Sequence, residues 1–297
     1  MDLSLLVTGA SGLLGSKIVR IAVARGCEVY SAYNEHYPSL GKPVKLNITD
    51  QVSVRRVIDE LKPEVIIHTA AMTNVDKCEL EKDLALKVNY EGTANIARAA
   101  KSVGAFLIYI STDYVFKGDK GFYRENDITD PINFYGYSKL KGEEAVKEIL
   151  DEYCIARTSV LYGSRPARGK VNFVLWLIDK LRKGESVRVV SDQFISPTFN
   201  TNLAEMLLEV ADREFAGVYH LAGASRVSRL DLAFELAEVF NLDRSLIRSA
   251  KMDDMNWVAK RPRDSSLDVS KAIRTLKNKP LTLREALTRL KFELEGS

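Results

Sequence analysis

A glycine-rich turn between a strand-like run and a helical pattern restricts the fold more than any other feature of this sequence. Gly9, Gly12 and Gly15 follow the apolar run 3–8 and open a segment with helical apolar spacing over residues 13–25. Glycine adopts the unusual φ of a tight turn and lets a phosphate approach the backbone, and a helix N-terminus adds N–H groups and partial positive charge. An ordinary strand-turn-helix corner is the alternative, but the position in the first βα unit favours a dinucleotide-binding turn.

The first half of the chain continues to alternate short apolar runs with helical patterns. We expect strands over 3–8, 28–32, 65–68, 105–111 and 153–158, and helices over 13–25, 53–61, 91–103 and 137–150. Strands that recur with helices between them are typical of a parallel sheet covered on both faces. The sequence therefore predicts an α/β fold with a Rossmann-type doubly wound parallel sheet.

The pattern changes after about residue 161. Helices are expected over 173–183, 203–211, 230–240 and 283–294, and short strands over 187–190 and 218–221, with polar connections between them. We expect a smaller C-terminal substrate-binding part packed against the sheet. In this division, residues 1–163 with about 187–225 form the dinucleotide-binding domain, and about 164–186 with 226–297 form the smaller part.

Composition excludes several classes of function. Lys and Arg number 43 and Asp and Glu number 40, so no large field attracts nucleic acid or an anionic membrane. No apolar stretch approaches the ~20 residues of a membrane-spanning helix. The three cysteines and three histidines are scattered, which argues against a disulfide framework and against a metal site. The chain runs directly into an apolar strand without a basic leader, so we expect a cytoplasmic protein.

Two overlapping Tyr-x-x-x-Lys pairs occur in the helix expected near residue 137, and helical geometry distinguishes them. At about 100° per residue, Tyr135 and Lys139 lie on an apolar stripe, whereas Tyr137 and Lys141 lie on the opposite, charged stripe. Reduction of a ketone needs a proton at the oxygen that becomes an alkoxide, and a lysine ammonium nearby lowers the phenol pKa from about 10. We therefore predict Tyr135 as the general acid and Lys139 as its partner, which also binds the nicotinamide ribose.

Small and polar residues follow the ends of two other strands. Thr112 comes at the carboxyl end of the strand 105–111, where ligands bind in parallel sheets, and its hydroxyl can donate to the substrate oxygen. Ala70 and Ala71 follow the strand 65–68 and let a cofactor lie close to the sheet. The alternatives are a hydroxyl that only caps its loop and two small core residues.

The end of the second strand bears on the choice of cofactor. NAD-binding sites usually carry an acidic residue there, but the run 29–34 has none; Glu28 stands at the strand start, and Glu35 is expected beyond the contact. No arginine stands there either, only His36 and the later Lys42. The sequence favours NADP(H), with NAD(H) also accepted.

These motifs, in their order and spacing, resemble the extended short-chain dehydrogenase/reductase family over essentially the whole chain, and within it the dTDP-4-dehydrorhamnose reductases. The segments that carry the resemblance are 9–15, 68–79, 111–116, 135–143, 157–158, 192–193 with 196–198, and 261–262. The resemblance implies NAD(P)H-dependent reduction of the 4-keto group of a nucleotide-linked deoxysugar, most closely dTDP-4-dehydrorhamnose to dTDP-L-rhamnose. It leaves room for a homodimer.

The resemblance also implies roles for individual residues. The catalytic residues would be Thr112, Tyr135 and Lys139. The cofactor would contact Gly9, Ser11, Gly12, Leu13, Leu14, Gly15, Asn47, Ile48, Ala70, Ala71, Thr73, Tyr135 and Lys139. The sugar would contact Asp113 and Tyr114, the nucleotide part Asn172 and Phe173, and the diphosphate Arg261. The chain departs from the family where Asn47 replaces a frequent Asp and Val160 replaces a frequent Trp.

Two other functions remain open. A nucleotide-sugar epimerase or dehydratase can share this fold, but dehydratases typically follow the threonine with Asp-Glu, and here Tyr114 follows Asp113. Epimerases usually retain NAD tightly, which the strand end without an acid disfavours. A non-catalytic cofactor-binding regulatory subunit, similar to the β subunit of methionine adenosyltransferase, is the other candidate. The complete set of Thr112, Tyr135 and Lys139 favours catalysis.

Overall fold

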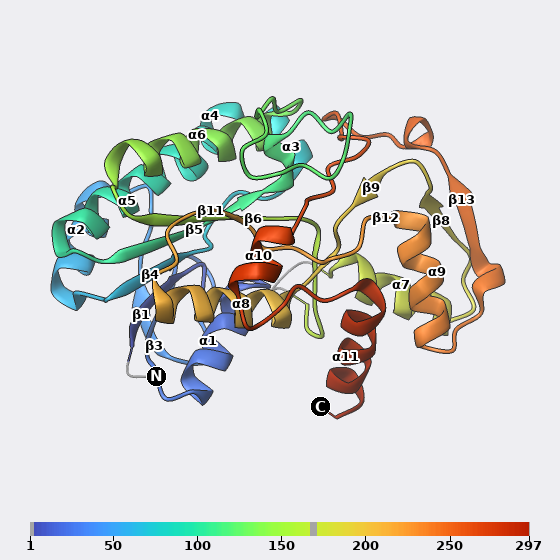
Figure 1. Cartoon of the computed structure of the whole chain (residues 1–297), viewed down its shortest axis with the longest axis horizontal. Helices are drawn as coiled ribbons and strands as arrows, with labels where there is room; N and C mark the ends of the chain where they lie inside the picture. Colours follow the sequence, from blue (N-terminus) through green and yellow to red (C-terminus); the bar gives the residue numbers. More distant parts are fainter. Residues whose placement is uncertain (1–2, 167–170, 297) are drawn as a thin grey trace.

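The computed structural model describes residues 3–166 and 171–296 and contains a seven-stranded parallel sheet (Figure 1). The strands lie in the order β11-β6-β5-β4-β1-β2-β3. Their bounds are β1 Ser4–Thr8, β2 Glu28–Tyr33, β3 Lys42–Lys45, β4 Val65–His68, β5 Phe106–Thr112, β6 Tyr153–Thr158 and β11 Gly217–His220. The direction of winding reverses between β1 and β4, so the carboxyl ends of these strands border a crevice. The predicted fold class is confirmed.

Helices cover both faces of the sheet (Figure 1). The helices on one face are α1 (Gly15–Ala24), α8 (Asn200–Arg213) and α10 (Ser270–Thr275), and those on the other are α2 (Gln51–Leu61), α5 (Gly92–Val103) and α6 (Phe134–Ile149). Each helix buries its apolar stripe, as Ile18, Val19 and Ala22 of α1 illustrate. Asp50 caps α2 by accepting hydrogen bonds from the backbone N–H groups of Val52 and Ser53.

A second apolar core lies at the carboxyl side of the sheet, on the right of Figure 1. It contains α7 (Phe173–Arg182), α9 (Arg229–Val239), α11 (Leu283–Glu295), β8 (Val187–Val190) and β13 (Ile247–Ala250), and β8 pairs in parallel with β13. Short pairs join this part to the rest: β7 (Leu161–Tyr162) with β10 (Thr198–Phe199), and β9 (Phe194–Ile195) with β12 (Val227–Ser228). The remaining helices are α3 (Val75–Leu80), α4 (Lys82–Leu86), a π-helix at Lys87–Glu91, and 3-10 turns at Asp113–Val115, Arg244–Leu246 and Met252–Asp254.

Differences from the expected elements have local causes. Helix α6 begins at Phe134, three residues before the expected start, because the Asn133 side chain caps it by accepting from the Gly136 N–H. Strand β3 was not predicted, since its Lys-Pro-Val-Lys sequence lacks apolar alternation. Polar residues and proline are characteristic of an edge strand, which is where β3 lies.

The packing of the two cores differs from the expected two-part division at two places. Val187 and Val189 pack in the second core, although the division assigned them to the dinucleotide-binding domain. Ala272 and Leu276, assigned to the smaller part, pack against the sheet. The division itself stays a prediction, and its positions 1, 2, 167–170 and 297 lie outside the described residues. In the described part of the chain, no helix has the length and apolarity needed to span a membrane.

A buried ion pair fixes α6 to the sheet. The Arg157 guanidinium of β6 donates to both carboxylate oxygens of Glu143 on α6, at 2.8 and 2.7 Å. The Ser111 hydroxyl of β5 donates to the same carboxylate at 2.6 Å. Burial alone would raise the pKa of Glu143, but the Arg157 hydrogen bonds hold it below its ordinary value. Glu143 is therefore a buried anion that depends on its partner.

We expect Arg157→Met to lower the free energy of unfolding by about 3–5 kcal/mol, because it leaves the Glu143 carboxylate buried without its countercharge. Denaturant titration measures this change. Lys141→Met is the control, since it removes the exposed pair of Lys141 with Glu144 and should change stability little. Equal stability of Arg157→Met and the wild type would contradict the assigned role of this pair.

Candidate active site

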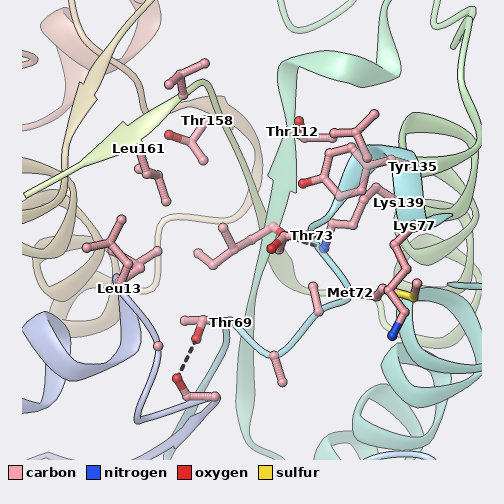
Figure 2. A pocket seen from close by; sticks show the side chains of 18 of the residues that line it. Leu13, Thr69, Met72, Thr73, Lys77, Thr112, Tyr135, Lys139, Thr158 and Leu161 are labelled. Atoms are coloured by element: carbon pink, nitrogen blue, oxygen red, sulfur yellow. Dashed lines mark hydrogen bonds between the residues drawn. The ribbon is translucent and has the colours of Figure 1, made fainter. Parts of the chain in front are cut away.

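A cavity of about 1360 Å³ opens at the carboxyl edge of the sheet and extends to the second core (Figure 2). All of the residues that the sequence predicted for the site line this cavity. They are the catalytic set Thr112, Tyr135 and Lys139, the cofactor set Gly9, Ser11, Gly12, Leu13, Leu14, Gly15, Asn47, Ile48, Ala70, Ala71 and Thr73, and the substrate set Asp113, Tyr114, Asn172, Phe173 and Arg261. The fold thus brings the three sets together, while their individual roles stay predictions.

The glycine turn is shaped by close backbone contacts. Gly9 has a φ of +66°, and a Cβ there would lie 2.9 Å from the Ala70 nitrogen, while a Cβ on Gly15 would overlap the Gly9 carbonyl. A Cβ on Gly12 would meet only the Gly9 oxygen, at 3.2 Å, so this glycine keeps the adjoining cavity open. Helix α1 follows with no capping side chain and no acidic residue in its first turn. This combination fits the diphosphate of a dinucleotide.

A hydrogen-bond network of buried polar side chains lies beside the glycine turn. Thr8 Oγ1 is hydrogen-bonded to His68 Nδ1 at 2.7 Å, and His68 Nε2 to Thr93 Oγ1 at 3.1 Å. The Ala70 N–H donates to Thr8 Oγ1 at 3.2 Å. Burial lowers the pKa of His68 to about 3, so the imidazole is neutral at physiological pH. The network joins β1, β4 and α5 beside the glycine turn, and no sequence pattern predicted it.

The three predicted catalytic side chains meet in the cavity (Figure 2). Thr112 ends β5, and Tyr135 and Lys139 lie in the first two turns of α6. The Lys139 ammonium donates to the Ile110 carbonyl at 2.7 Å and lies 4.1 Å from the centre of the Tyr109 ring. Tyr137, the member of the rejected pair, is 39% exposed on the outer face of α6, as the helical geometry predicted.

Burial determines the protonation of the pair. It raises the pKa of Tyr135 well above that of a free phenol, although a hydrogen bond with Thr112 opposes the rise. It also lowers the pKa of Lys139 to about 7, and the charge of Glu143 opposes that fall. The expected lowering of the Tyr135 pKa by Lys139 is therefore wrong, because burial removes the hydration that a phenolate needs. The consequence is a phenol that keeps its proton at neutral pH, which is the form a general acid requires.

Asp113 organises the hydroxyl beside Tyr135. Its carboxylate accepts hydrogen bonds from Thr112 Oγ1 at 3.0 Å, Ser159 Oγ at 2.8 Å and Ser265 Oγ at 2.6 Å. Burial raises the pKa of Asp113 to about 6, against the effect of these three hydroxyls. Asp113 therefore holds the Thr112 side chain at the end of β5, in addition to its predicted contact with the sugar. The sequence did not indicate Ser159 or Ser265, which are distant along the chain.

The π-helix carries a residue that sequence reasoning missed. Asn89 accepts from the Met72 N–H at 2.8 Å and donates to the Met72 carbonyl at 3.0 Å and to Ser138 Oγ at 2.9 Å. It thereby ties the segment after β4 to the helix that carries Tyr135. Single π-turns are frequent at functional sites, but their extra residue interrupts the apolar spacing from which helices are predicted.

Two of the predicted substrate residues already have hydrogen-bond partners within the protein. The Asn172 side chain caps α7 by accepting from the Leu175 N–H at 3.1 Å, and donates to the Gly163 carbonyl at 3.0 Å. The Arg261 guanidinium makes two hydrogen bonds to Asp76 on α3, at 2.8 and 2.9 Å. Its charge is thus balanced before any diphosphate arrives. Lining residues for which the sequence predicted no role include Trp176, Gln193, Arg229 and Trp257.

Two further positions bear on the ligand. Glu35, which was expected beyond the cofactor contact, lines the cavity with Asn34 and His36, because β2 extends to Tyr33 and brings residue 35 to the rim. The expectation that Glu35 lies beyond the cofactor contact stays a prediction. Thr158 is 6% exposed, and within the described residues its hydroxyl has no hydrogen-bond partner. It pairs in register with Thr112 and also lines the cavity, so it is available to a polar ligand.

Comparison with known proteins identifies one matching family model and several relatives of similar length. The family model of the RmlD substrate binding domain matches residues 3–295. The chain is 38% identical over 267 residues to a probable low-salt glycan biosynthesis reductase, Agl14, of Haloferax volcanii, covering 89% of both chains. It is 38% identical to dTDP-4-dehydrorhamnose reductase of Streptomyces griseus over 90% of this chain and 86% of that one. It is also 34% identical to the methionine adenosyltransferase 2 subunit beta of Xenopus laevis, over 90% and 80%.

A solved structure is similar over the whole chain. It is dTDP-4-dehydrorhamnose reductase of Bacillus anthracis in complex with NADP, with a TM-score of 0.88 and 33% identity, covering 99% of this chain and 100% of that one.

The lowered pKa of Lys139 predicts a pH dependence of stability. Between the folded value of about 7 and the ordinary value of 10.5, the unfolded chain holds one more proton at this position, so stability rises with pH by up to about 1.4 kcal/mol per unit. Lys139→Met should lose most of this rise between pH 7 and 9, measured by denaturant titration. Lys141→Met, with its exposed ammonium, should keep the wild-type slope. Equal slopes in all three proteins would contradict the burial of the Lys139 charge.

Proposed function

Since the chain belongs to the family of the RmlD substrate binding domain, we propose that it is an NAD(P)H-dependent oxidoreductase that reduces the 4-keto group of a nucleotide-linked deoxysugar. The substrate we propose is dTDP-4-dehydrorhamnose, and the product dTDP-L-rhamnose. One observation carries the proposal: Tyr135, Lys139 and Thr112 line the same cavity as the glycine turn at the start of α1. The predicted membership of the extended short-chain dehydrogenase/reductases is confirmed by the family model and by the reductases at 38% and 33% identity.

The chain's own residues supply the proton and the orientation. A bound nicotinamide supplies the hydride that C4 of the sugar accepts. Tyr135 donates its phenolic proton to the oxygen that becomes the C4 hydroxyl, and the buried environment keeps that proton in place until the oxygen gains charge. Lys139, fixed by the Ile110 carbonyl, presents its ammonium beside the phenol as the phenolate forms. The Thr112 hydroxyl, which donates to Asp113 in the free protein, turns its proton to the keto oxygen when the substrate binds and orients that oxygen toward Tyr135.

NADPH is the cofactor that we propose as preferred, with NADH also used. No arginine follows β2, but Asn34 and His36 line the cavity there and do not repel a 2′-phosphate. Glu35 favours NADH instead, because its carboxylate can accept a hydrogen bond from the ribose 2′-hydroxyl. The NADP complex of the similar reductase from Bacillus anthracis supports the first choice.

A second candidate function rests on the similarity to the methionine adenosyltransferase 2 subunit beta. In that case the chain would bind a dinucleotide and regulate a partner without turnover. The complete catalytic set favours the reductase. A dehydratase is disfavoured because Tyr114, whose ring centre lies 5.9 Å from that of Tyr135, stands where a second carboxylate would be needed. A homodimer and a cytoplasmic location stay predictions.

The decisive experiment is a coupled assay with enzymatically made dTDP-4-dehydrorhamnose. We expect the loss of NADPH absorbance to depend on the keto sugar, with slower loss for NADH. UDP- and GDP-linked 4-keto sugars, run in parallel, identify the nucleotide. Absence of turnover with every 4-keto sugar would overturn the reductase and favour the regulatory function, and protein isolated with tightly bound NAD would favour an epimerase.

Tyr135→Phe tests the proton donor. It should lower kcat by about 10²–10⁴, the range for loss of a general acid, and leave the Kd for NADPH nearly unchanged, because the ring stays in place. Tyr137→Phe is the matched control on the exposed face of the same helix and should retain wild-type kcat. Steady-state kinetics and fluorescence titration of NADPH measure the two quantities. A Tyr135→Phe enzyme with unchanged kcat would show that another group donates the proton.

A further inference from the structure

Among the described residues, three arginines line the cavity, and they differ in how their charge is balanced. Arg188 donates to Asp254 at 2.8 Å, and Arg261 forms the paired hydrogen bonds with Asp76. Within residues 3–166 and 171–296, no carboxylate forms an ion pair with Arg229. A guanidinium that faces a cavity without a countercharge favours an anionic ligand there.

Arg229 is held in place by neutral groups. It is the first residue of α9, whose start is fixed by the capping box of Ser228 and Asp231. Its Nε donates at 2.6 Å to the side-chain oxygen of Gln193, which is fully buried and donates in turn to the Pro262 carbonyl at 3.3 Å. No acceptor for its two Nη groups occurs among the described residues. The side chain is thus positioned while its hydrogen-bonding edge stays free for a ligand.

The position of Arg229 lies between the two ends of the predicted substrate site. Its guanidinium carbon is 5.7 Å from the centre of the Phe173 ring, which stacks on Trp176 and was predicted to meet the nucleotide. Tyr114, predicted to meet the sugar, lines the same cavity and is close enough to Arg229 for its charge to act on the phenol. Burial raises the pKa of Tyr114, and among the nearby charges Arg229 opposes that rise most strongly, ahead of Arg261.

The covalent order of a nucleotide sugar matches this arrangement. The diphosphate is attached at C1, across the pyranose ring from the C4 that Tyr135 would protonate, and the nucleoside follows the diphosphate. We propose that Arg229, and not Arg261, is the cation that binds the diphosphate of the substrate. A guanidinium offers two parallel N–H groups to two phosphate oxygens. The assignment rests on the proposed reductase function, because that function sets the orientation of the substrate in the cavity.

Binding of the diphosphate alone tests the proposal. Arg229→Gln should raise the Kd for dTDP, measured by titration calorimetry, by about tenfold or more, the effect of losing a hydrogen bond to a charged group. It should leave the Kd for thymidine and for NADPH unchanged. Arg229→Lys keeps the charge without the paired N–H groups and should give an intermediate loss for dTDP only. UDP with uridine and GDP with guanosine are titrated in the same way.

Arg248→Gln is the matched control, because it removes the same charge from an exposed position on β13 that does not belong to the cavity lining. It should bind dTDP as the wild type does. Three outcomes would overturn the assignment. They are an unchanged Kd for dTDP in Arg229→Gln, an equal loss of affinity for dTDP and thymidine, and a wild type that binds none of the three diphosphates. If Arg229→Gln does not fold, the Arg229→Lys titration decides between the same outcomes.

Turnover of the wild type with the keto sugar is measured in parallel, so the two proposals fail separately. A wild type that reduces the sugar, with dTDP binding that is indifferent to Arg229, overturns only the assignment. Diphosphate binding that depends on Arg229, without any turnover, overturns only the reductase.

Discussion

The docking of α6 against the sheet depends on the buried ion pair of Glu143 with Arg157, and the position of Tyr135 on that helix depends on the docking. Lys139 and Glu143, one helical turn apart, both enter the protein interior, where one is met by the Ile110 carbonyl and the other by Arg157. Gly142 lies between them, and a Cβ there would overlap the Tyr109 hydroxyl, so only glycine allows this close approach of the helix to β5. Buried ion pairs lose much of their attraction to desolvation, but they permit few alternative arrangements. The buried pair of Glu143 with Arg157 therefore holds the helix that carries Tyr135.

The electrostatic character of the cavity follows from the same burial. Removal of water raises the pKa of Asp113 to about 6 and lowers that of Lys139 to about 7, and both groups lie within the catalytic region. His68 below the glycine turn stays neutral for the same reason. Desolvation thus moves an acid and a base toward neutrality from opposite sides, a pattern that is common at sites that transfer protons. Hydroxyl groups solvate the Asp113 carboxylate, and the Ile110 carbonyl accepts from the Lys139 ammonium.

Sequence reasoning predicted what is local and missed what joins distant segments. The glycine turn, the order of strands and helices, and the choice of Tyr135 over Tyr137 all follow from spacings within one or two elements. The partners that complete the site are distant: Asp76 meets Arg261 across 185 positions, and Asp113 meets Ser265 across 152. Local spacing contains no information on such pairs. The pKa of Tyr135 was mistaken for a related reason, because the sequence identifies the neighbouring ammonium and not the extent of burial.

The sheet and the second core contribute different residues to the cavity, and this difference explains why the fold alone does not determine the substrate. Residues from the sheet and its helices supply the glycine turn, the proposed proton donor and the buried lysine, which would serve any reductase of this fold. The residues that we propose distinguish ligands lie near the second core, where Val160 replaces a frequent Trp and Arg229 has no ion pair with a described carboxylate. Arg261, by contrast, joins this part to α3 through Asp76, so its charge contributes to the assembly of the site. A change of substrate within the family would then require changes near α7 and α9 and would leave Tyr135 and Lys139 untouched.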